Sequence, residues 1–252
     1  HLWYRRQRQM CIRDSSITYM LKTMKIIKNE KSFTITDFKI NKKYKYNEFT
    51  RNDGDTGRTY NVGEFKVPSV TTILSATQSE EKKQGLKDWR DRVGYAEASR
   101  ITNQAATRGT EMHYILEQYF QGQGYLNLSK EGILPRMMAH TIVSNLEKLS
   151  QIYGTEVTLN YEDQWAGSSD AVGIYDNKPT IIDFKQSNKP KREEWIEDYY
   201  YQIAAYALAH KKNFGDIKQG LICVCTKDLL YQGFLVDACL LYTSDAADDT
   251  TG

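Results

Sequence analysis

Hydrophobic and polar positions alternate in different ways along the chain, which predicts strands, then helices, then strands again. Short apolar runs between residues 25 and 66 are broken by polar turns, with the strongest turn signal at 52–55 and a returning strand at 58–66. The first helix is expected to begin at Pro68 or Ser69. Helical periodicity then covers residues 82–106, 108–121 and 130–152.

The second half of the chain is rich in β-branched and aromatic residues, which are typical of strands. A helix is predicted at 193–211, after three strands and before two more. The order predicts one α/β domain with a central mixed β-sheet flanked by helices, because no repeat or linker interrupts the pattern. The strands are predicted at 155–161, 165–175, 180–185, 220–226 and 230–236, with a turn at 176–179.

The composition is that of a soluble globular protein, with 40% hydrophobic and 26% charged residues among 252. No apolar run is long enough to cross a bilayer, so no membrane partner is expected. The formal net charge of +2 neither requires nor excludes nucleic acid, because clustering of Lys and Arg on one face matters more. Cys223 and Cys225 lie two apart in an apolar run, so we expect buried, reduced thiols.

Both ends of the chain resemble a translated sequencing adapter. The runs from Arg6 to Asp14 and from Cys239 to Asp248 can be encoded by opposite strands of one DNA segment. Unrelated ends of a natural protein should not be antisense copies, so we expect residues 1–15 and 239–252 to be artefacts around a domain at 16–238. Translation would then start at Met20 or Met24. The alternative is a basic N-terminal arm and an acidic tail.

A shortened chain of residues 24–238 is expected to fold as well as the full chain, because the adapter-like ends evolved with no part of the domain. Thermal melting of both proteins measures this, and equal melting temperatures are expected. A melting temperature many degrees lower for the shortened chain would show that the ends are structural.

The run Ile181-Ile182-Asp183-Phe184-Lys185 carries the sharpest chemical signal. Alternate side chains of a strand share a face, so Asp183 and Lys185 point together while Ile182 and Phe184 point into the core. A carboxylate therefore lies beside an amine at the end of an apolar strand. Taken alone, the pattern also suits a solvated strand end with a loose ion pair.

A second acid, Asp170, lies on the preceding strand of a predicted hairpin, where it can face Asp183 across the ladder. Neighbouring carboxylates repel each other, and a hard cation such as Mg²⁺ or Mn²⁺ relieves the repulsion by binding oxygen ligands. The alternative is that Asp170 simply ends its strand near Gly167.

The predicted helix at 108–121 adds His113 and Glu117, which lie four residues apart and therefore on one face. They border the apolar stripe of the helix, where an imidazole can complete a metal site built from carboxylates. Alternatively, His113 is a histidine at the edge of the core and Glu117 a surface ion-pairing residue. The stripe consists of Met112, Ile115, Leu116, Tyr119 and Phe120.

The predicted helix at 193–211 carries one stripe of aromatic and amide side chains, namely Trp195, Tyr199, Gln202 and Tyr206. A buried Gln must be hydrogen-bonded, and a mixed stripe beside an acidic site suits contact with phosphate, sugar or bases. Ordinary amphipathic packing explains Trp195 and Tyr199 equally well.

Taken in order, these motifs resemble the RecB-like branch of the PD-(D/E)XK nuclease superfamily. The family pattern is a helix with G-x-x-x-H-x-x-x-E, strands with G-x-x-D and D-x-K, and a helix with Q-x-x-x-Y. The match spans about half the chain, and the run from Val67 to Thr71 is similar to phage exonucleases and mitochondrial genome-maintenance exonucleases. The matching residues are Gly109, His113, Glu117, Gly167, Asp170, Asp183, Lys185, Gln202 and Tyr206.

The resemblance implies a single restriction-endonuclease-like domain with Mg²⁺ or Mn²⁺ as cofactor. Some relatives carry an iron–sulfur cluster on four cysteines, but the body of this chain holds two, so no cluster is expected. The implied metal ligands are His113, Asp170, Asp183 and the carbonyl group of Phe184.

The resemblance also implies roles in catalysis. Lys185 would position or activate the attacking water and stabilise charge on the phosphate, together with Asp170 and Asp183, and Glu117 is a further catalytic candidate. The implied substrate-binding residues are Gln202, Tyr206, Tyr199 and Arg108.

The implied function is a metal-dependent exonuclease that hydrolyses phosphodiester bonds of single-stranded DNA or DNA ends, in the cytoplasm of a bacterium or a phage-infected cell. DNA is the expected partner. A structure-specific endonuclease of the same superfamily, a non-catalytic DNA-binding module and a metal-free domain with chance acids are the alternatives.

Overall fold

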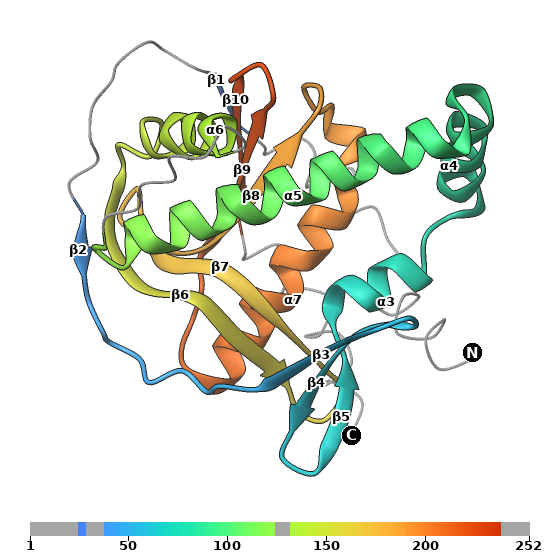
Figure 1. Ribbon diagram of the computed structural model, residues 1–252. Helices are drawn as coiled ribbons and strands as arrows, with labels where there is room; N and C mark the ends of the chain where they lie inside the picture. The colour runs from blue at the N-terminus through green and yellow to red at the C-terminus, as the bar shows by residue number, and fades with distance from the viewer. Residues whose placement is uncertain (1–24, 29–37, 124–131, 238–252) are drawn as a thin grey trace.

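A central seven-stranded sheet carries helices on both faces in the computed structural model, which describes residues 25–28, 38–123 and 132–237 (Figure 1). The prediction of one α/β domain with a mixed central sheet flanked by helices is confirmed. The adapter-like runs at 1–15 and 239–252 lie outside the described residues.

The sheet is mixed because two of its strand pairs are parallel, β8 with β9 and β2 with β6, while the others are antiparallel. β8 lies in the middle of the sheet, so the strand with the D-x-K motif has a neighbour on each side. In spatial order the strands are β1 (Lys25–Lys28), β10 (Tyr231–Asp237), β9 (Gln219–Thr226), β8 (Lys178–Ser187), β7 (Trp165–Tyr175), β6 (Leu149–Tyr161) and β2 (Lys39–Ile40).

The hairpin between β7 and β8 turns on two residues, Asp176 and Asn177, which both have positive φ angles (48° and 61°). Asp and Asn tolerate this left-handed conformation better than most residues, and two such residues in succession match the twist of a tight hairpin. Tyr175 pairs with Lys178 directly across the turn. The turn predicted at 176–179 is therefore shorter than expected.

Helices α5 (Tyr95–Phe120) and α6 (Ile133–Val143) cover one face of the sheet, and α3 (Val70–Ala76) and α7 (Glu197–Asn213) cover the other. The predicted apolar stripe of α5 packs in the first core with Ile182 and Phe184 of β8. Val70 and the buried side chains of α7 form the second core with Ile181 and Ile222. Burial of both faces explains why β9 is almost continuously apolar and why β8 carries Ile181 and Ile182 side by side on opposite faces.

The predicted helix boundaries are wrong at three places, the first of which is the break predicted between 106 and 108, because α5 runs through it without interruption. Gly94, with a φ of 85°, separates α4 (Glu80–Val93) from α5, so the periodicity across 82–106 belongs to two helices. The helix predicted at 130–152 ends at Val143, and β6 begins at Leu149. Leu149 and Ile152 are buried on the sheet, and their spacing of three suits a helix as well as an irregular strand.

A small second sheet of β3 (Thr50–Gly54), β4 (Gly57–Val62) and β5 (Phe65–Pro68) lies beside α3 (Figure 1). The strand predicted at 58–66 is instead a hairpin that turns at Gly63, which has a φ of 58°. Ser69 is the N-cap of α3, as predicted, and its Oγ accepts a hydrogen bond from the Thr72 backbone N. A bridge from Ser69 to Ala166 attaches this small sheet to β7.

No helix in the described part of the chain is both long and apolar enough to cross a membrane.

Candidate active site

The end of the β7–β8 ladder brings the two predicted acids together. Regular pairing stops at Ala171 and Ile182, one residue short of Asp170 and Asp183. Beyond that point the Phe184 backbone N donates a hydrogen bond of 2.6 Å to Oδ2 of Asp170. The Asp170 side chain therefore replaces a missing backbone partner, which fixes its carboxylate at the edge of β8.

Asp183 is buried, with 1% of the residue exposed, and its Oδ2 lies 2.5 Å from Nζ of Lys185. The two side chains share a face of β8, as the strand pattern predicted. Neither Asp183 oxygen accepts a hydrogen bond of regular geometry from the described residues. Burial raises the pKa of Asp183 to about 6, and the charge of Asp170 adds to this effect although Lys185 opposes it.

His113 reaches the site from α5. Its Nδ1 lies 3.3 Å from Oδ1 of Asp170, and its ring meets the ring of Phe184 edge-on at 6.5 Å. Burial alone would lower the pKa of His113, but the neighbouring Asp170 carboxylate outweighs burial and raises it. The neighbours Met112 and Leu116 are buried in the core, which holds this part of the helix against the sheet.

Glu156 on β6 also reaches this site and was not among the residues predicted from the sequence. Ligand atoms of Glu156, His113 and Asp170 all lie within 4.8 Å of one another. Ser168 donates a hydrogen bond of 3.0 Å to Oε2 of Glu156. Glu156 is an exposed residue, but the pKa of its carboxyl group is raised. The main cause is the loss of water around the carboxyl group, and the negative charge of Asp170 adds to it.

The register of the β6–β7 hairpin explains this placement. Thr155 pairs with Ala171 and Val157 with Ser169, so Glu156 lies opposite Asp170. This register follows if the predicted strands at 155–161 and 165–175 form a hairpin. Glu156 could therefore have been predicted from the sequence as the residue opposite Asp170.

Glu117 lies close to this cluster but is not one of its three members. Its carboxylate accepts a hydrogen bond of 2.9 Å from Gln121, which also donates to Thr155. The charge of Glu117 contributes to the raised pKa of Glu156, so the two acids are neighbours. A catalytic role of Glu117 stays a prediction.

The Gln202–Tyr206 pair on α7 is buried, and Gln202 donates a hydrogen bond of 3.2 Å to the Tyr206 hydroxyl. A Cβ atom at Gly167 would lie 2.5 Å from the Tyr206 ring. Gly167 therefore allows α7 to pack closely against β7, three residues before Asp170. This contact links the predicted G-x-x-D and Q-x-x-x-Y motifs physically.

The other predicted substrate-binding residues lie around the end of β8. Nζ of Lys185 is 5.2 Å from the centre of the Tyr199 ring, and Arg108 of α5 donates hydrogen bonds to Gln186. Trp195 was predicted on the same helical stripe, which is wrong, because it lies in the short 3₁₀ helix η1 (Glu193–Trp195) that ends before α7 begins. Its side chain is exposed, and Arg192 lies over its ring.

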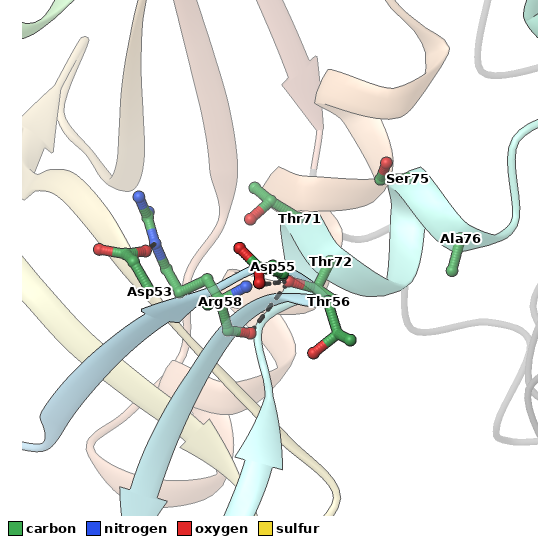
Figure 2. A pocket seen from close by; sticks show the side chains of 10 residues that line it. Asp53, Asp55, Thr56, Arg58, Thr71, Thr72, Ser75 and Ala76 are labelled. Carbon is green, nitrogen blue, oxygen red and sulfur yellow. Dashed lines mark hydrogen bonds and ion pairs between the residues drawn. The ribbon is translucent and has the colours of Figure 1, made fainter.

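A hollow of about 510 Å³ lies away from these acids, between the β3–β4 hairpin and α3 (Figure 2). The Thr72 hydroxyl joins its two sides, because it donates to the Arg58 carbonyl at 2.9 Å and accepts from the Arg58 backbone N at 2.8 Å. Asp53 in its wall is neutralised by ion pairs with Arg51 and Arg58. The hollow includes none of the cluster acids, so it is separate from the candidate site at β7 and β8.

The donor set suits a hard divalent cation. Carboxylate oxygens of Asp170 and Glu156, together with the imidazole of His113, are ligands that Mg²⁺ and Mn²⁺ accept, and Asp183 is not a member of this group of three. Asp183 adds a carboxylate that is buried and poorly hydrogen-bonded, which is the state that a bound cation would relieve. Cys223 and Cys225 are free and buried in β9, as predicted.

Comparisons with known proteins point towards nucleases. The chain is similar to mitochondrial genome maintenance exonuclease 1 of Homo sapiens (28% identical over 173 residues), Mus musculus (30% over 177) and Xenopus tropicalis (32% over 187). Each match covers 64% of this chain and 49–50% of the relative, so the chain spans about half the length of these relatives.

No family model matches the chain. A solved structure described as "Crystal structure of SSO0001" has a TM-score of 0.33 and 15% identity, over 66% of this chain and 71% of the other.

Proposed function

We propose that the chain is a divalent-metal-dependent DNA nuclease of the PD-(D/E)XK type, acting as an exonuclease. The observation that carries the proposal is the Asp183 carboxylate, which is buried and in contact with Lys185 but accepts no regular hydrogen bond from any residue that the structure describes. Asp170 and His113 lie beside it. Buried carboxylates are normally paired and fully hydrogen-bonded, so this arrangement favours a bound cation as the additional partner.

His113, Asp170, Asp183 and the Phe184 carbonyl are the ligands we propose, with Glu156 as a further one. When bound, the ion supplies an acidified water and positive charge for the phosphate oxygens. The chain holds these ligands in place before any substrate arrives, because β8 is central in the sheet and α5 is anchored in the core.

Lys185 acts on the substrate from the same face as Asp183. The neighbouring Asp183 and Asp170 carboxylates outweigh burial and raise the pKa of Lys185, so its ammonium group stays protonated at neutral pH. We propose that this charge positions the attacking water and stabilises the developing charge on the phosphate. Tyr199, whose ring lies near Nζ, would limit the positions that Lys185 can adopt.

Gln202 and Tyr206 have a positioning role in this proposal, because both are buried in the protein. Tyr206 packs against Gly167 and holds β7, which carries Asp170. A direct contact with DNA would require these side chains to leave the core.

The similarity to the mitochondrial exonucleases supports DNA as substrate and an exonuclease mode. We propose single-stranded DNA or DNA ends as substrate and DNA processing in the cytoplasm of a bacterium or a phage-infected cell as the setting. The test uses the purified protein with Mg²⁺ or Mn²⁺ on end-labelled linear single strands, linear duplexes and closed circles. We expect nucleotides to be released from linear DNA and not from closed circles. Cleavage of circles would establish an endonuclease instead, and absence of any cleavage would leave a DNA-binding module.

Glu156→Gln is expected to weaken Mn²⁺ binding by roughly tenfold or more, because a neutral amide replaces a charged ligand; changes around metal sites typically cost 10–100-fold. Isothermal calorimetry with Mn²⁺ measures the affinity without any cleavage. Glu162→Gln is the matched control, because Glu162 lies just after β6 and pairs with the exposed Lys212. If Glu156→Gln binds Mn²⁺ as tightly as the control, Glu156 is not a ligand.

A further inference from the structure

Arg108 on α5 is held in one orientation by two side-chain amides. Its Nε and Nη2 donate to Oε1 of Gln186 at 3.0 and 2.7 Å, and Nη2 also donates to Oδ1 of Asn188 at 2.5 Å. Gly109 helps this contact, because a Cβ there would lie 3.2 Å from the Gln186 side chain. A guanidinium has five N–H groups, so these three hydrogen bonds leave the two on Nη1 for another ligand.

The charge of Arg108 is not balanced by an acid. Both of its acceptors are neutral amides, and no carboxylate of the described residues forms an ion pair with it. Burial lowers the pKa of Arg108, and no neighbouring charge is among the causes. Arg100, two turns earlier on the same helix, pairs instead with Glu97 at 2.6 Å. A partly buried cation with neutral neighbours favours an anion from outside the protein.

Arg108 also lies close to the strand that carries Asp183 and Lys185, because its hydrogen-bond partner Gln186 belongs to that strand. Gln186 directly follows Lys185 on β8, and alternation along the strand puts these two side chains on opposite faces. His113 lies five residues further along α5. The two cations therefore lie at the same end of β8 but on opposite faces of the sheet. Lys185 lies on the face of Asp183, and Arg108 lies on the face covered by α5.

We propose that Arg108 is a preorganised clamp for a backbone phosphate next to the scissile phosphate, and that the bound chain is a single DNA strand. This inference rests on the proposed function, since it takes DNA as the substrate. Gln186 and Asn188 orient the guanidinium, so little side-chain entropy is lost when the phosphate binds. Arg108 then contributes to affinity and to the placement of the strand, while Lys185 serves the scissile phosphate.

The experiment measures binding of a fluorescent single-stranded oligonucleotide in Ca²⁺, by anisotropy at several KCl concentrations. Arg108→Gln is expected to weaken binding several-fold at low salt and to reduce the slope of log K against log salt by about 0.7, the value for one phosphate of a single strand. Arg100→Gln, the matched control, should keep the wild-type slope. Asn188→Ala should keep the slope and weaken binding a few-fold, because the charge remains but its orientation is lost.

Two further measurements separate the clamp from other roles. Compared with the wild type and the Arg100→Gln control, Arg108→Gln should need several-fold more DNA to reach half of its maximal single-turnover rate, because it has lost one phosphate contact. Its melting temperature should be unchanged or higher, because an unbalanced, partly buried charge has been removed. An unchanged salt slope, an unchanged half-saturating DNA concentration or a clear loss of stability would each overturn the clamp.

The outcomes also distinguish this inference from the proposed function. If the wild type cleaves DNA but Arg108→Gln keeps the full salt slope, the clamp is wrong and the nuclease stands. If the wild type fails to cleave but binds DNA with an Arg108-dependent slope, the nuclease is wrong and the phosphate site stands.

Discussion

Replacing Asp183 with Asn is expected to abolish DNA cleavage while making the metal-free protein more stable. Cleavage should be lost because a neutral amide is a much weaker ligand for a hard cation than a carboxylate. Stability should rise because the substitution removes a buried charge that lies near Asp170 and accepts no regular hydrogen bond within the described part of the chain. Lys185 loses its partner, but 21% of its side chain is exposed and can reach water.

The gain in stability of Asp183→Asn over the wild type should be larger at neutral pH than at acidic pH. Burial raises the folded-state pKa of Asp183 to about 6, above its value of about 3.9 in an unfolded chain. At pH values between these two pKa values, Asp183 binds more protons in the folded state than in the unfolded state. The stability of the wild type therefore falls as pH rises from about 4 to 6. A shift of this size corresponds to on the order of 3 kcal/mol, so Asp183→Asn should melt several degrees higher than wild type at pH 7. The difference should disappear near pH 4.

Thermal melting at pH 4 and pH 7, without metal and with Mn²⁺, measures this. Mn²⁺ should stabilise the wild type and not Asp183→Asn, because only the wild type retains the full set of ligands. Asp216→Asn is the control, because Asp216 forms an exposed ion pair with Lys218 and is not one of the proposed metal ligands. Equal stabilisation of Asp183→Asn and wild type by Mn²⁺ would remove Asp183 from the metal site.

The residues that could be predicted from the sequence are those whose placement depends on local geometry. Asp183 and Lys185 share a face because side chains alternate on any strand. Asp170 follows from a two-residue hairpin, which puts neighbouring strands side by side. His113 borders an apolar stripe whose period of 3.6 positions it against the sheet.

Glu156 could have been predicted, because the hairpin expected from 155–161 and 165–175 places it opposite Asp170. Contacts between segments far apart in the sequence could not. The pairing of Arg108 with Asn188 joins residues 80 positions apart. The end of α6 was misplaced for a similar reason, because an apolar spacing of three or four does not show whether a helix or a sheet buries it.

Lys185→Ala is expected to reduce the rate of DNA cleavage by about a hundredfold or more, with little loss of DNA affinity. A fixed positive charge near the reacting phosphate stabilises charge that grows only in the transition state, so its removal acts on the rate. Other contacts along the DNA backbone carry the affinity. Lys185→Arg should restore part of the activity at most, because a planar fork replaces a compact charge.

The measurement is single-turnover cleavage at saturating Mn²⁺, beside DNA binding in Ca²⁺. Saturating metal is needed because Asp183 has no other ion-pair partner among the described residues, so its pKa should rise further when Lys185 is removed, and protons then compete with the metal. Lys218→Ala is the control, because Lys218 has an exposed ion pair and lies at the opposite end of β8 and β9. If Lys185→Ala cleaves DNA at the wild-type rate, the contact between Lys185 and Asp183 is only a structural ion pair. The proposed catalytic role of the D-x-K strand would then be wrong.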